Sequence, residues 1–238
     1  MKNFYSPNFH RNKRLARSIK MVIIHYTGMQ SERESIKRLC NPSSKVSSHY
    51  LINRSGKIFK LVDDKHIAWH AGKSCWKKYK NLNKNSIGIE LVNKGHRHGY
   101  TSFKKKQIIT LVKLCRILKK KYRIKKKNFV GHSDIAPFRK IDPGEKFPWE
   151  FLSKKKIGIW HNYKPYFLRK YRKLKTGKKD IKKFSKLLRK IGYCSISGNL
   201  KAPISLTKAF QRHFRKDLIN GILDQECLKI ADNLAKKY

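Results

Sequence analysis

Three short apolar runs constrain the fold of this chain more than any other feature. They read MVIIHYTGM from residue 21, NSIGIELVN from residue 85 and NFVGH from residue 128. Apolar runs of this length, bounded by polar or turn residues, are typical of buried strands. A further segment, SHYLINRSGKIFKLV, has two β-rich stretches around Arg54-Ser55-Gly56, which indicates a hairpin. Together these segments predict a central sheet.

Helical segments alternate with these strands. Residues 31–40 predict a short helix, with Ser31 as its N-cap and Glu34 completing a capping box. Between residues 103 and 122, apolar side chains recur at helical spacing, with lysines on the other face. We therefore predict an α/β fold in which helices flank a mixed central β-sheet.

The sequence changes in character after Trp149. Residues 156–177 are dense in lysine and show no clean period, so we predict a basic linker there. Three short amphipathic segments follow within residues 178–238, and Asp224 caps the third. Three such helices can form a small bundle. We therefore predict a first domain over 1–155, this linker, and a three-helix domain over 178–238.

The charge is strongly positive. Lys and Arg account for 60 of the 238 residues, and the formal net charge is +46. Such a chain is attracted to polyanions such as nucleic acid, anionic lipid or anionic cell-wall polymer. The excess is spread along the whole chain, which fits a general compositional bias toward lysine equally well. Charge thus leaves a basic nucleic-acid-binding protein as an alternative, although no nucleic-acid-binding motif is recognisable.

The cysteines and the N-terminal residues bear on the cellular compartment. The five cysteines are scattered, odd in number and never in a C-x-x-C pair, which predicts reduced thiols. The first residues carry charges but no apolar core segment, so we expect no secretory signal. This favours the cytoplasm, with the periplasm as the alternative. No apolar run approaches the roughly 18 residues of a membrane span, so none is expected.

Two histidines stand out among the ten. His25 ends one predicted strand and His132 follows another, so both emerge at a sheet end, where α/β proteins place their sites. Asp142 follows in a loop between two prolines. Two imidazoles and one carboxylate match the ligand count of a catalytic zinc with one position open for water. The alternative for any single histidine is a hydrogen-bonded structural role.

Glu90 and Lys140 complete this constellation. A carboxylate inside the run SIGIELV costs free energy unless it is paired or used, so Glu90 is either half of a buried salt bridge or a general base. Lys140 precedes Asp142 by two residues. Its fixed charge could stabilise an oxyanion that develops beside the metal.

Several motifs carry a family resemblance. In chain order they read IIHYTGM, VSSHYLINRSGKIFKLV, AWHAGKS, NSIGIELVN and GHSDIAPFRKIDPGEKFPW. Over roughly residues 5–152 the chain resembles the zinc-dependent N-acetylmuramoyl-L-alanine amidases of the type 2 (AmpD-like) family, which are related to peptidoglycan-recognition proteins. The resemblance implies one zinc per chain, held by the residues His25, His132 and Asp142. It also implies that Glu90 and Lys140 are catalytic.

The C-terminal region carries a second resemblance. Residues 178–238 are similar to the small three-helix peptidoglycan-binding domain of some of these amidases, best in AFQRHF and GILDQE. The alternative is a bundle with a structural role only. If the domain serves to bind cell-wall peptidoglycan, truncation after about residue 155 should leave hydrolysis of small muropeptides largely intact.

The resemblance implies hydrolysis of the amide between the lactyl group of N-acetylmuramic acid and L-alanine of the stem peptide. Peptidoglycan or released muropeptides would be the substrate, and we expect a monomer. The chain has four further candidates for the substrate cleft, namely His49, Trp69, His70 and Arg139. A peptidoglycan-binding module without activity is the main alternative, although all five active-site positions are filled.

Overall fold

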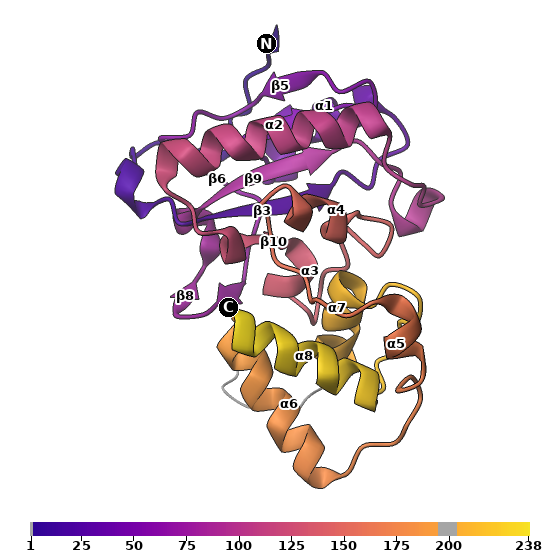
Figure 1. Cartoon of the computed structure of the whole chain (residues 1–238). Coiled ribbons are helices and arrows are strands. Elements are labelled where there is room, and N and C mark those ends of the chain that lie inside the picture. The colour runs from indigo at the N-terminus through magenta and orange to yellow at the C-terminus, as the bar shows by residue number, and fades with distance from the viewer. Residues whose placement is uncertain (1, 195–203) are drawn as a thin grey trace.

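The computed structural model describes residues 2–194 and 204–238, and its centre is a six-stranded sheet in the order β1-β5-β4-β9-β3-β10. The sheet lies in the upper part of the molecule in the view of Figure 1. Only β4 and β5 pair antiparallel in it, so the sheet is mixed, as predicted. Its strands are β1 (Lys2–Asn3), β3 (Met21–Tyr26), β4 (Tyr50–Ile52), β5 (Ile58–Lys60), β9 (Ser86–Leu91) and β10 (Phe129–Gly131). Two small ribbons lie outside this sheet and pair β2 (Phe9–His10) with β6 (Ile67–Ala68) and β7 (Cys75–Trp76) with β8 (Tyr79–Lys80). The predicted hairpin around Arg54-Ser55-Gly56 joins β4 to β5.

Side chains alternate along the central strands between the two faces of the sheet. Val22 and Ile24 of β3 share a buried cluster with Ile108 and Leu111 of α2 (Lys105–Tyr122). The intervening side chain of Ile23 enters a different cluster on the opposite face. His25 continues this second series, because successive strand side chains point to opposite faces. The same alternation along β9 places Glu90 on the face of His25.

The helix predicted over 31–40 is α1 (Glu32–Cys40). Ser31 is its N-cap, and the Ser31 hydroxyl accepts from the Glu34 N–H. The Glu34 carboxylate accepts from Gln30 N–H, one residue earlier than a capping box requires. The cap is therefore confirmed, but the reciprocal half of the box is shifted.

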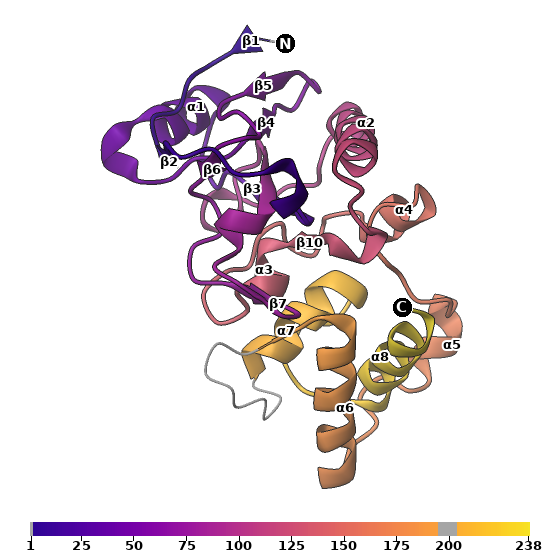
Figure 2. The same ribbon diagram turned by 90° about the vertical axis from the view of Figure 1, so that its left-hand side faces the viewer.

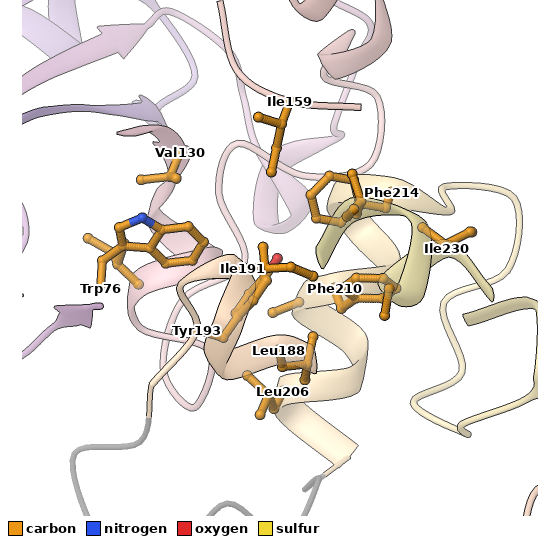
Figure 3. Close-up of a cluster of buried hydrophobic side chains, with 14 of the residues drawn as sticks. Trp76, Val130, Ile159, Leu188, Ile191, Tyr193, Leu206, Phe210, Phe214 and Ile230 are labelled. Atoms are coloured by element: carbon orange, nitrogen blue, oxygen red, sulfur yellow. The ribbon is translucent and has the colours of Figure 1, made fainter. Parts of the chain in front are cut away.

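The three C-terminal helices are present as α6 (Lys178–Ile191), α7 (Ile204–Phe214) and α8 (Gln225–Lys237). Asp224 caps α8 by accepting from Cys227 N–H. Their buried residues do not form a core of their own. Phe184 and Phe210 belong to one cluster with Met21, Ile23 and Val130 of the central sheet (Figure 3). The C-terminal helices thus pack on the sheet side opposite α2.

The segment 156–177 is more than a linker. It contains the short helix α5 (Pro165–Arg169), and Ile157, Ile159 and Leu168 are buried. Few apolar residues, without periodicity, are enough to anchor a segment that crosses a packed surface. The boundaries at 155 and 178 stay predictions.

The prediction of reduced thiols is also wrong. Cys75 and Cys194 form a disulfide across 119 residues, between β7 and the residues after α6. Cys40, Cys115 and Cys227 are free. None of the helices in the described part of the chain combines the length and apolar character that crossing a bilayer requires.

Two further short helices follow β10. They are α3 (His132–Ile135), which begins directly at the strand end, and α4 (Trp149–Lys154). α3 lies against α7, so the C-terminal helices meet the end of the sheet that carries His132 (Figure 2).

Candidate active site

His25, His132 and Asp142 converge at the carboxyl ends of β3 and β10. The His25 and His132 Nδ1 atoms are 3.0 Å apart, and the Asp142 Oδ2 atom lies 3.0 Å and 3.1 Å from them. All three residues are buried. Parallel pairing of β3 with β10 brings the two histidines together, and Asp142 returns through the loop after α3.

The hydrogen bonds of the other ring nitrogens orient both imidazoles. Ser86 Oγ–H donates to the Leu82 carbonyl at 2.6 Å, which leaves its oxygen to accept from His70 Nε2 at 3.2 Å. His70 Nδ1 then accepts from His25 Nε2 at 3.0 Å. His132 Nε2 donates to the Ala71 carbonyl at 3.2 Å. Both Nδ1 atoms are therefore left with lone pairs that face Asp142.

This donor set fits a metal ion. Three lone-pair donors at mutual distances near 3 Å repel one another unless a cation lies between them. Ligands that bind one zinc at about 2.0–2.2 Å are separated by roughly this distance. The proton on each distal nitrogen is held by a carbonyl or a second imidazole, the arrangement that fixes metal-binding histidines. His25, His132 and Asp142 form the one such group of three potential ligands in the described parts of the chain.

The pKa shifts of His25 and Asp142 favour the protonation states that bind a cation. Burial lowers the pKa of His25 to about 4, with the neighbouring His132 acting in the same direction. Burial opposes ionisation of Asp142, but the two imidazoles outweigh it and hold the pKa of Asp142 well below its usual range. At neutral pH, His25 is thus a neutral imidazole beside a carboxylate.

Glu90 lies beside this group without a partner. It lines the same cavity as the three donors, and no hydrogen bond to its buried Oε2 atom occurs among the described residues. Burial raises the pKa of Glu90 to about 8, and the Asp142 carboxylate adds to the rise while Lys140 opposes it. No ion pair to Glu90 occurs within 2–194 or 204–238, so the buried salt bridge that the sequence left open is not formed there. An unpaired carboxyl group that faces a cavity is suited to exchange protons with a ligand.

The cavity has a volume of about 330 Å³. Trp69, His70, Arg139 and Lys140 line it together with the residues above, as do Arg38 and Leu39 of α1. Among the positive side chains that line it, Arg38 and Arg139 are exposed and Lys140 is partly buried. α1 contributes to this wall, which no sequence motif indicated.

The four residues predicted for the substrate cleft differ in their placement. Trp69 lines the cavity. His70 lines it too, but both of its ring nitrogens are engaged, with His25 and Ser86. Arg139 lies at the margin, where its guanidinium donates to the carbonyls of Ala71 and Lys73.

His49 is a correction, because it is fully buried and does not line the cavity. Its Nδ1 accepts from Gly88 N–H at 3.0 Å, and its Nε2 lies 2.8 Å from the Arg14 guanidinium. The side chain therefore supports strand β9 at Gly88. The motif SSHYL carried no signal that separates this role from substrate contact.

Comparison with known proteins agrees with this geometry. The sequence profile of the family described as N-acetylmuramoyl-L-alanine amidase matches residues 15–145. The chain is 36% identical to the N-acetylmuramoyl-L-alanine amidase AmiD of Escherichia coli, over 92% of this chain and 83% of AmiD. It is 32% identical to the 1,6-anhydro-N-acetylmuramyl-L-alanine amidase AmpD of Haemophilus influenzae, over 61% of this chain and 86% of that protein.

Two solved structures are similar over nearly the whole length. The E. coli AmiD complex with the substrate anhydro-N-acetylmuramic acid-L-Ala-D-gamma-Glu-L-Lys has a TM-score of 0.80 at 36% identity, covering 93% of this chain and 90% of AmiD. AMPDH3 from Pseudomonas aeruginosa, in complex with anhydromuramic pentapeptide, has a TM-score of 0.81 at 32% identity, covering 98% and 97%. Both matches extend through the C-terminal helices as well as the sheet. With a potential metal site at the sheet end and a family profile over more than half its length, the chain belongs to the N-acetylmuramoyl-L-alanine amidases that act on peptidoglycan.

Proposed function

We propose that this amidase uses one zinc ion to cleave the bond between the lactyl group of N-acetylmuramic acid and L-alanine of the stem peptide. The observation that carries the proposal is the convergence of His25, His132 and Asp142 beside the unpaired carboxyl group of Glu90. When bound, zinc would polarise the scissile carbonyl and lower the pKa of a water molecule.

The protein's own residues would move the protons and stabilise charge. Ionised Glu90 would accept a proton from the attacking water and pass it to the departing amine of L-alanine. Lys140 lies two residues before Asp142 and lines the cavity. Its ammonium group would donate to the oxyanion that develops on the carbonyl oxygen. Trp69 offers an apolar surface to the sugar or peptide at the cavity wall.

Metal content and product identity test this proposal together. Purified protein should contain about one zinc per chain, lose activity with a chelator and recover it with added zinc. Mass spectrometry of the products should show free stem peptide that begins with L-alanine. Full activity in metal-free protein would overturn the zinc mechanism.

We propose soluble muropeptides with a 1,6-anhydro sugar as the preferred substrate. Support comes from the two similar amidases, whose solved complexes contain anhydromuramic peptides. Digestion of intact sacculi and of soluble anhydro-muropeptides side by side tests this preference. Faster release of stem peptide from intact sacculi than from soluble anhydro-muropeptides would contradict it.

We propose an oxidising compartment such as the periplasm, in place of the cytoplasm that the sequence favoured. Support comes from the Cys75–Cys194 disulfide, because such bonds persist where thiols are not kept reduced. Thiol labelling of protein taken from its native cells should find Cys75 blocked. We also propose a monomer, which light scattering at several concentrations tests.

A further inference from the structure

The buried carboxylate of Asp134 connects the C-terminal helices to the metal site. It lies two residues after His132 and is 1% exposed. Its Oδ2 atom accepts from Gly131 N–H at 2.7 Å and from His213 Nδ1 at 2.8 Å, and its Oδ1 atom accepts from the Tyr193 hydroxyl at 2.7 Å. Two of these three donors belong to the C-terminal region.

The backbone that Asp134 holds carries two of the three potential metal ligands. Gly131 directly precedes His132, and Ser133 N–H donates to the Asp142 carbonyl at 2.8 Å. A Cβ atom on Gly131 would lie 2.6 Å from Cδ of Pro143, so this turn packs tightly against the residue after Asp142. A shift of the Gly131–Asp134 turn would therefore move His132 relative to Asp142.

Packing fixes the two C-terminal donors. The His213 ring stacks on Trp149 with centroids 4.0 Å apart and an interplanar angle of 14°. The Tyr193 ring meets Trp76 edge to face at 5.0 Å (Figure 3). The Lys77 N–H donates to the Gly192 carbonyl at 2.7 Å, and the Cys75–Cys194 disulfide closes the same contact. His213 cannot leave Asp134 without losing its stacking on Trp149, and Tyr193 cannot leave it without disturbing its packing on Trp76.

An interface that only packs two units together would not need a buried polar network. A buried carboxylate is costly unless it is fully hydrogen-bonded, and apolar side chains would join the two surfaces at lower cost. Here the carboxylate belongs to the turn of a potential metal ligand, and two of its three hydrogen-bond donors come from the C-terminal region. The hydrogen bonds from Tyr193 and His213 thus act on the turn that carries His132.

We infer that the C-terminal helices position the metal site of this amidase, with Tyr193 and His213 as positioning residues that act on His132 through Asp134. The inference rests on the proposed zinc site. It assigns these helices a role in the catalytic unit that is independent of any binding to the cell wall. Loss of either donor should loosen the Gly131–Asp134 turn and weaken zinc binding.

Zinc affinity of the full chain, measured by competition with a chromophoric chelator, tests this inference. Tyr193→Phe removes one hydroxyl, and His213→Leu removes the ring donor. Each should weaken zinc binding by about 10-fold, the low end for residues that orient metal ligands. His213→Asn should restore much of the affinity, because its amide nitrogen can donate from the position of Nδ1. Tyr166→Phe is the control, since Tyr166 is exposed on α5 and should leave affinity unchanged.

Amide hydrogen exchange of Gly131 in the zinc-free protein gives a second readout that activity does not influence. Exchange should be faster in Tyr193→Phe and His213→Leu than in Tyr166→Phe. Unchanged zinc affinity and unchanged Gly131 exchange in the folded variants would overturn the inference alone. If His213→Leu does not fold, Tyr193→Phe decides, because it removes a single oxygen atom. Failure of the unaltered protein to bind zinc would overturn the proposed function, and the inference with it.

Discussion

His25 and Glu90 occupy paired positions on the adjacent parallel strands β3 and β9. Both side chains project from the same face of the sheet into the cavity. Adjacent strands lie about 4.8 Å apart, so the sheet itself sets the spacing between the His25 imidazole and the Glu90 carboxyl group. A rigid spacing of this kind suits the proposed mechanism, in which Glu90 would accept a proton from the attacking water.

Glu90→Gln should keep its zinc and lose most of its rate. The amide has the shape of the carboxylate but cannot accept the proton of water, so kcat should fall by about 10²–10⁴-fold. Zinc content and kcat are measured on the same preparation. A variant that retains near-normal kcat would remove Glu90 from the mechanism.

Zinc content and kcat should also distinguish the roles of Lys140 and Asp142. Lys140→Ala should lower kcat by about 10²–10³-fold, the usual effect of losing one oxyanion donor, while zinc stays near one per chain. Asp142→Ala should lose zinc and activity together, because it removes one of three ligands. Loss of zinc from Lys140→Ala would show that the lysine supports the metal site and not the oxyanion.

The chemical groups of the site could be predicted from the sequence because the polar residues interrupt strand patterns. His25 and Glu90 interrupt apolar runs, and the parallel pairing of those runs brings them together. His49 shows the limit of this reasoning. A histidine beside a strand looks the same in sequence whether it faces a ligand or, as here, accepts a hydrogen bond from the Gly88 N–H.

Contacts between distant segments could not be predicted. Cys75 and Cys194 are 119 residues apart, and nothing in their local sequence pairs them. Asp134 and Tyr193 are likewise joined only by the folded chain. The three C-terminal helices follow from local periodicity, but the surface on which they pack depends on the complete sheet.

Gly88→Ala should weaken zinc binding through His70. A Cβ atom at this position would lie 2.5 Å from the His70 ring, which accepts from the Nε2–H of His25. Displacement of His70 would leave the orientation of His25 unfixed, and zinc affinity should fall by about 10-fold or more. Gly177→Ala is the matched control, because no atom beyond the adjacent residues lies within 4 Å of the added Cβ. Equal zinc affinity of the two variants would contradict this role of His70.

Asp64 should contribute stability that depends on pH. Burial opposes its ionisation, but hydrogen bonds from Tyr122, Tyr50 and Lys121 outweigh burial and lower the pKa of Asp64. A lowered folded-state pKa means that the contribution is fully present above the unfolded value of about 3.9 and is lost as pH falls through the folded value. Asp64→Asn should therefore lower the free energy of unfolding by roughly 1–3 kcal/mol at pH 7.

The difference between Asp64→Asn and the unaltered protein should shrink as the pH is lowered below about 4. Denaturant unfolding at pH 7 and at pH 3 measures it. Asp63→Asn is a suitable control, since Asp63 is exposed and pairs with Lys60 at the surface, where such pairs contribute about 0–1 kcal/mol. A difference that is constant with pH would show that Asp64 acts through packing alone.

Truncation after residue 155 should destabilise the remaining chain, contrary to the expectation from sequence that activity on small muropeptides would survive. The C-terminal helices cover Met21, Ile23 and Val130, which are at most 2% exposed in the full chain. Exposure of each large apolar side chain costs about 1.5–3 kcal/mol, and Asp134 would also lose two hydrogen-bond donors. Together these losses approach the whole stability of a typical domain, about 5–15 kcal/mol. Thermal unfolding of residues 1–155 should therefore begin well below that of the full chain, with zinc binding weakened in parallel. A soluble 1–155 protein with an unchanged midpoint and unchanged kcat would show that the sheet does not need its C-terminal cover.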